Sequence, residues 1–114
     1  MLKFKNPEKL TRDQINKIFE SGNTHEICGA LVSMAFYDDD WKWSQDQCLH
    51  FLEHPQWEIR GLAATCLGHI ARIHGQLDRE LVEAALKKHL SDKKIADRIE
   101  FALEDIEDYL DDPN

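Results

Sequence analysis

The sequence predicts an all-α protein of about six helices, arranged as three stacked antiparallel helix pairs in a single domain over residues 1–114. Apolar residues recur at intervals of three and four along most of the chain, which is the spacing of helices with one buried face. The apolar pattern also repeats with drifting periods of 32 and 36 residues. Such periods are typical of repeated helix pairs, and three pairs are about the minimum that buries a continuous core.

The first predicted helix begins at a capping box, in which the Thr11 hydroxyl and the Gln14 side chain satisfy free backbone N–H groups. It ends at residues 21–23, where Ser-Gly-Asn is a stop signal. We expect Thr24 to cap the second helix. The apolar positions of that helix are Ile27, Ala30, Leu31, Met34 and Ala35.

Residues 38–43 (Asp-Asp-Asp-Trp-Lys-Trp) are predicted to be the most polar and most aromatic connector. Residues 44–47 (Ser-Gln-Asp-Gln) repeat the capping-box form, so we expect the third helix to begin there. Pro55 enforces a corner, and a long fourth helix follows within two or three residues and ends at His74 and Gly75. The predicted buried face of the fourth helix consists of Ile59, Leu62, Ala63, Cys66, Leu67, Ile70 and Ile73.

The last helix pair follows the same pattern. Asp78 is expected to cap the fifth helix, and Ser91 and Asp92 are expected to begin the sixth. The apolar positions of the fifth helix are Leu81, Val82, Ala85, Leu86 and Leu90. Those of the sixth are Ile95, Ile99, Ala102, Leu103, Ile106 and Leu110.

Residues 54–60 (His-Pro-Gln-Trp-Glu-Ile-Arg) and the small and apolar residues after them resemble the HEAT-repeat family, particularly its short bacterial, phycobilisome-lyase type. The usual family run is Asp-Pro-Asp-Pro-Glu-Val-Arg. His54 and Gln56 replace its two aspartates, which leaves open whether Arg60 makes the usual Asp–Arg contacts at this turn. The resemblance implies an α-solenoid whose second, fourth and sixth helices line the concave face.

The composition indicates which cellular compartment and which kinds of partner to expect. The chain has no apolar run of about 18 residues, so we expect no membrane span, no signal peptide and a cytoplasmic location. The three cysteines, Cys28, Cys48 and Cys66, fall within helical patterns and are expected to be reduced and buried. The formal net charge of −8 disfavours direct binding of nucleic acid and favours a basic partner.

Most of the negative charge lies at the C-terminal end. Residues 97–114 hold 8 acidic side chains against Arg98 alone, whereas residues 1–96 have a net charge of −1. Carboxylates near a helix C-terminus face the negative end of the helix dipole and one another, which opposes stability. We therefore expect either a solvated end helix or a docking surface for a basic partner. The acidic residues expected to bind that partner are Asp97, Glu100, Glu104, Glu107, Asp108 and Asp111.

Three tryptophans, Trp41, Trp43 and Trp57, form the second candidate group for partner binding. If they are partly exposed, they have the side chains that most often anchor protein interfaces. The alternative is that they fill gaps between the turns of the helix pairs. Some of the three tryptophans can bind a partner while others fill gaps between the turns.

Metal binding and catalysis are not expected. His50 and His54 are four residues apart, as are some pairs of zinc ligands, but no acidic partner accompanies them. The sequence contains no Gly-rich phosphate loop, nucleophile elbow or His-Glu-x-x-His run. We predict a protein that is not an enzyme and that needs no cofactor.

Among short bacterial HEAT-like proteins, the architecture resembles that of immunity proteins of contact-dependent or polymorphic toxin systems. The resemblance implies a cytoplasmic binding module, monomeric when free, that neutralises a cognate toxin. Because many such toxins are nucleases with basic clefts, the acidic sixth helix is expected to occupy the place of the phosphate backbone. The alternative is a bilin-lyase-like or chaperone-like protein that holds a small ligand or client in its concave groove.

Overall fold

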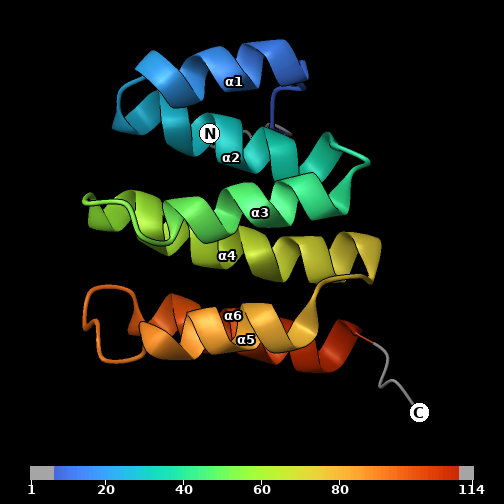
Figure 1. Ribbon diagram of the computed structural model, residues 1–114, viewed down its shortest axis with the longest axis vertical. Coiled ribbons are helices and arrows are strands. Elements are labelled where there is room, and N and C mark those ends of the chain that lie inside the picture. Colours follow the sequence, from blue (N-terminus) through green and yellow to red (C-terminus); the bar gives the residue numbers. More distant parts are fainter. Residues whose placement is uncertain (1–6, 111–114) are drawn as a thin grey trace, which may run out of the picture.

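The computed structural model describes residues 7–110, and within that range the chain is all-α with no strand. Figure 1 shows the helices stacked as three antiparallel pairs, α1 with α2, α3 with α4, and α5 with α6. The predicted fold class is confirmed. The helices are α1 (Arg12–Ser21), α2 (Thr24–Tyr37), α3 (Trp41–Phe51), α4 (Trp57–His74), α5 (Arg79–Lys88) and α6 (Ala96–Tyr109).

The first two helices begin at capping boxes. Thr11 and Gln14 form the predicted box at α1. At α2 the prediction was one residue late, because Asn23 rather than Thr24 is the cap. The Asn23 side chain accepts a hydrogen bond from the Glu26 N–H at 2.9 Å, and Glu26 accepts one from the Asn23 N–H at 3.0 Å. An Asn amide oxygen and a Glu three residues later satisfy two N–H groups that the helix leaves free.

The predicted start of α3 at Ser44 was wrong. The helix begins at Trp41, and the Asp40 carboxylate caps it by accepting a hydrogen bond from the Trp43 N–H at 3.1 Å. Gln45 is buried, and its side chain exchanges two hydrogen bonds with Asp78, of 2.8 Å to the carboxylate and 2.7 Å from the backbone N–H. Asp78 stands at the N-cap position of α5 but makes no side-chain cap bond. Its carboxylate binds the side chains of α3 instead.

Helix α4 is the centre of the core. It packs against both α2 and α6, and it ends as predicted at Gly75, which has a left-handed backbone with φ of 65°. Five of its predicted core residues are fully buried, namely Ile59, Ala63, Cys66, Leu67 and Ile70. Leu62 is only partly buried, and Ile73 is exposed because it lies at the end of the helix, beyond the part that both neighbours cover.

The last pair differs from the prediction at its edges. Leu81 is exposed, because the buried face of α5 is narrow and consists of Val82 and Leu86. Leu90 is exposed in the turns that follow the helix, which ends at Lys88. Helix α6 begins at Ala96, later than predicted, because turns occupy residues 89–95. Those turns bring Asp92 to Arg60, near the start of α4. The buried residues of α6 are Ile99, Ala102 and Ile106, which were all predicted, whereas the predicted Leu103 and Leu110 are only partly buried.

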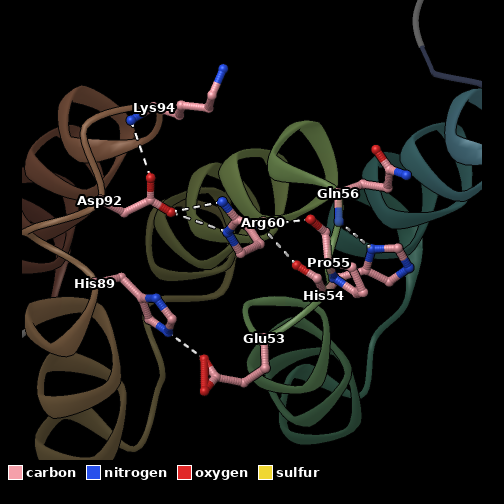
Figure 2. A network of polar contacts seen from close by, with 8 residues as sticks. All are labelled: Glu53, His54, Pro55, Gln56, Arg60, His89, Asp92 and Lys94. Atoms are coloured by element: carbon pink, nitrogen blue, oxygen red, sulfur yellow. Dashed lines mark hydrogen bonds and ion pairs between the residues drawn. The ribbon is translucent and has the colours of Figure 1, made fainter.

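Arg60 joins three segments at this end of the molecule (Figure 2). Its guanidinium donates to the Asp92 carboxylate at 2.8 and 3.1 Å, and to the backbone carbonyls of His54 and Pro55 at 3.0 Å each. The same picture shows His89 reaching the Glu53 carboxylate. Arg60 therefore does contact an aspartate, one that lies 32 residues further along the chain. This contact ties the α3–α4 turn to the start of the last pair.

The three cysteines are free thiols, and Cys48 and Cys66 are buried while Cys28 is partly buried. A hydrogen bond to Cys66, together with burial, raises the pKa of the Cys48 thiol. Burial also raises the pKa of the Cys28 thiol. Thiols held protonated in this way are weak nucleophiles and behave as small core residues.

Candidate functional site

Helix α6 carries a negatively charged face that points away from the core. Its buried residues, Ile99, Ala102 and Ile106, pack on α4, so the opposite side of the helix faces solvent. Four exposed carboxylates lie on that side, and we call them the acidic face of α6: Asp97, Glu100, Glu104 and Asp108. Their spacing of three, four and seven residues places them next to one another along the helix surface.

Other carboxylates of α6 are engaged within the fold. Glu107 pairs with Arg79 of α5 at 2.5 Å, and Asp105 lies 3.8 Å from Arg72 of α4. Within residues 7–110, no hydrogen bond or ion pair engages the four side chains of the acidic face. Of the acidic residues predicted to bind a partner, the structure thus leaves Asp97, Glu100, Glu104 and Asp108 unpaired and pairs Glu107. Asp111 lies outside the described residues.

The last turns of α5 and α6 carry side chains of opposite charge. Helix α5 has Lys87 and Lys88 in its last turn, where positive charge complements the helix dipole. The last turn of α6 has no basic residue and carries Glu107 and Asp108. The cation of α6, Arg98, lies against α4, because a β-carbon placed on Gly61 would be 2.9 Å from its Cδ atom. Among residues 7–110, no ion pair joins Arg98 to the acidic face.

Phe101 lies beside this face and was missed by the sequence reasoning. Its side chain is 66% exposed, more than any other large hydrophobic residue among residues 7–110. A signal was present in the sequence, since position 101 falls outside the buried stripe of Ile95, Ile99 and Ile106. A bulky aromatic residue off the buried stripe of an amphipathic helix must point toward solvent.

The tryptophans are divided between the two ends of the α3–α4 pair. Trp41 and Trp43 lie in the first turn of α3, not in a connector as predicted, and Trp57 begins α4. Because α3 and α4 are antiparallel, these two starts lie at opposite ends (Figure 1). The structure therefore does not gather the three rings into one cluster.

Each tryptophan is partly buried against the core. The Arg12 guanidinium lies over the Trp43 ring at 4.1 Å from its centroid, and the Lys94 ammonium lies 5.2 Å from the Trp57 centroid. These cation–π contacts link α1 to α3 and the last pair to α4. This geometry fits rings that fill gaps between turns, and their part in partner binding stays a prediction.

The histidines and cysteines are dispersed. The His54 Nδ1 accepts a hydrogen bond from the Gln56 N–H at 3.0 Å, which uses the ring in the turn, and His50 packs edge-on against Phe51. Cys66 is buried, whereas the His69 Nδ1 lies 2.6 Å from the Arg72 guanidinium. In the described part of the chain, no three His, Cys, Asp or Glu side chains are grouped to hold a metal ion.

A groove of about 500 Å³ lies beside the first pair. Its described lining includes His25 and Cys28 but no aromatic side chain, and most of it is apolar, with Leu10, Val32 and Leu62. No residue of α6 lines it; the lining comes from the segment before α1, from α1 and α2, and from Leu62 of α4. None of the helices described is both long and apolar enough to cross a membrane.

The fold and the site define a small all-α protein with an unpaired acidic surface on its last helix. A chain in the crystal structure of a CDI complex from Cupriavidus taiwanensis has this fold, with a TM-score of 0.85 and 30% sequence identity over 96% of this chain and 98% of that chain. The chain belongs to the same family as that component of the CDI complex. No protein-family model and no curated protein matches, so the HEAT-repeat resemblance stays a prediction.

Proposed function

We propose that the chain is the immunity protein of a CDI system, where CDI stands for contact-dependent growth inhibition, and that it neutralises a cognate toxin by binding it. The observation that carries the proposal is the family relation to a component of a CDI complex. In this proposal the chain acts in the cytoplasm, needs no cofactor, catalyses no reaction and is monomeric when free.

The charge distribution favours the immunity component over the toxin. A toxin that cleaves nucleic acid needs a positive surface to hold phosphates. This chain has a formal net charge of −8 and an unpaired acidic face, which repel a phosphate backbone. The same face attracts the basic cleft that a nuclease-type toxin would present.

The acidic face would act mainly on the rate of association. Complementary charges raise association rate constants by about 10- to 1000-fold over a neutral encounter, and salt suppresses the gain. Asp97, Glu100, Glu104 and Asp108 lie on one rigid helix, so they present a single negative strip to the approaching toxin. Occupying the cleft with this strip would exclude the nucleic acid substrate.

The test measures binding to the cognate toxin domain, which this proposal expects to be encoded directly upstream of the gene for this chain. The test variant carries Glu100→Lys, Glu104→Lys and Asp108→Lys. A matched control carries Asp13→Lys, Glu20→Lys and Asp39→Lys, which change the net charge equally but lie on or beside α1 and α2.

We expect the α6 variant to lower the association rate constant by about 10-fold or more at low salt, with a smaller loss at 0.5 M salt. The control should lose much less. Equal rate constants for the two variants would show that net charge alone, and not the acidic face, guides the encounter. Toxin that binds neither variant nor the wild-type chain would contradict the immunity role itself.

A second candidate function is the holding of a small ligand in the groove beside the first pair. It is favoured by the volume of about 500 Å³ and by His25 and Cys28 in its lining. The pKa of the Cys28 thiol is raised by burial, which disfavours the thiolate that a covalent bilin attachment requires. A visible absorption band in protein purified from its own host would support this function, and colourless protein would exclude a retained bilin.

A further inference from the structure

We propose that Phe101 anchors the complex with the toxin, and that it enters an apolar pocket of the toxin bordered by lysine and arginine side chains. This assignment rests on the proposed function and adds to it the residue that holds the complex together. It also separates two roles on α6, with the carboxylates guiding the encounter and the aromatic ring slowing dissociation.

The exposure of Phe101 is the first observation. Its side chain is 66% exposed in the middle of a regular helix, whose core face is already complete with Ile99, Ala102 and Ile106. The fold therefore gains little from an aromatic ring at this position. A single exposed hydrophobic residue is common on protein surfaces, so the exposure alone does not identify an interface.

The surroundings of Phe101 are the second observation. Asp97 is four residues before it and Glu104 three residues after it, and residues at these spacings are direct neighbours on a helix surface. Asp108 follows seven residues after Phe101, on the same side. Interface hot spots have this arrangement, in which an aromatic residue is surrounded by polar groups that exclude water once the partner is bound.

The position of Arg98 is the third observation. Arg98 is three residues before Phe101, but its Cδ and Nε atoms lie where they would meet a β-carbon on Gly61, at 2.9 and 3.3 Å. Its side chain thus lies against Gly61 of α4, and among residues 7–110 no ion pair joins it to the carboxylates beside the ring. A partner that covers Phe101 must place cations around its own apolar pocket, because an uncharged or acidic rim would leave these carboxylates desolvated without compensation.

The support beneath Phe101 is rigid. Helix α6 packs on α4, where Gly68 allows the helices to approach so closely that an added β-carbon would lie 3.3 Å from the Ala102 Cα atom. A phenylalanine side chain has only two rotatable bonds, so its immobilisation on binding costs little entropy. An anchor on a fixed helix needs no rearrangement before the toxin docks.

The experiment compares Phe101→Ala with Leu81→Ala in binding kinetics against the toxin domain encoded directly upstream. Leu81 is the matched control, because it is an apolar residue that is 54% exposed and lies on α5 and not on α6. We expect Phe101→Ala to raise the dissociation rate constant roughly 30-fold or more while the association rate constant changes less than about threefold. Leu81→Ala should leave both constants within about twofold of wild type, and Phe101→Trp should retain most of the affinity.

The outcomes separate the anchor from the proposed function. If the wild-type chain binds the toxin and Phe101→Ala dissociates no faster than Leu81→Ala, the anchor assignment is overturned and the immunity role stands. If the wild-type chain does not bind the toxin, the immunity role is overturned, and the anchor assignment with it. A concentration-dependent dimer of the free wild-type chain that Phe101→Ala abolishes would identify a second copy of this chain as the occupant and overturn the assignment to the toxin.

Discussion

Two glycine-to-alanine substitutions on neighbouring helices should change stability in opposite directions. A β-carbon on Gly68 of α4 would lie 2.7 Å from the Asp105 Oδ2 atom and 3.3 Å from the Ala102 Cα atom. A β-carbon on Gly29 of α2 would meet nothing within 4 Å. Both glycines lie inside helices and have the same backbone conformation. A difference in stability between the two variants therefore reports the difference in packing.

The magnitudes follow from two opposing effects. Alanine in place of glycine within a helix stabilises the folded chain by about 0.5–1 kcal/mol. At Gly29 nothing opposes this gain. At Gly68 the Asp105 carboxylate can swing aside, but the Ala102 Cα atom belongs to the backbone of α6 and moves only if the helix moves. Overpacking of this kind costs about 1–3 kcal/mol, so we expect a net loss of up to about 2 kcal/mol for Gly68→Ala.

The assay is urea denaturation of both variants beside the wild-type chain, followed by circular dichroism. The two variants should differ by the overpacking cost of about 1–3 kcal/mol, which is at least about 4 °C in thermal midpoint. A Gly68→Ala chain as stable as Gly29→Ala would refute the claim that close approach of α4 and α6 requires glycine. Because α6 carries the acidic face, Gly68→Ala should also weaken toxin binding, whereas Gly29→Ala should not.

Two further predictions concern the polar contacts of α4. Arg60→Lys should lower the midpoint of urea denaturation more than Arg98→Lys does. The reason is that a lysine cannot make the forked contact with Asp92 and also reach the backbone carbonyls of the turn. Equal midpoints for the two variants would contradict this role of Arg60. The pKa of His69 is lowered, first by burial and then by the charge of Arg72, so the unfolded chain binds more protons than the folded one just below pH 6.5. Stability should therefore fall as the pH drops below about 6.5, and His69→Gln should flatten that decline in thermal midpoints recorded from pH 7.5 to 5.5.

Much of the fold could be predicted from local patterns in the sequence. The capping box at Thr11, the left-handed stop at Gly75 and the buried stripe of α4 all depend on residues within a few positions of one another. Such features can be read from one sequence because their physical causes are local. The same holds for the accumulation of carboxylates in α6, which is visible without knowing the fold.

The errors arose where a distant contact decided between local alternatives. Ser44 begins a good capping-box pattern, yet Gln45 is buried and bonded to Asp78, which lies 33 residues away. Gln45 makes this contact from within a helix that begins at Trp41, three residues before Ser44. Likewise, the late start of α6 places Asp92 against Arg60. The local sequence offers two caps for α3, Asp40 and Ser44, and does not decide between them.

The stability of the free chain offers an independent test of what the acidic face is for. Glu104 and Asp108 lie four residues apart near the C-terminal end of α6, where they repel each other and face the negative end of the helix dipole. Replacing Glu100, Glu104 and Asp108 by lysine leaves like charges four residues apart but complements the helix dipole. It should therefore raise the free energy of unfolding of the free chain at low salt, by a few tenths of a kcal/mol for each residue in the last turn. The same variant is expected to bind the toxin more slowly. A rise in stability together with a loss of binding would mean that these carboxylates destabilise the free chain but are needed to bind the toxin. A helix that is only solvated would not need destabilising carboxylates. If stability rises and binding to the toxin is unchanged, the acidic face serves solubility, and the toxin must contact another surface of the chain.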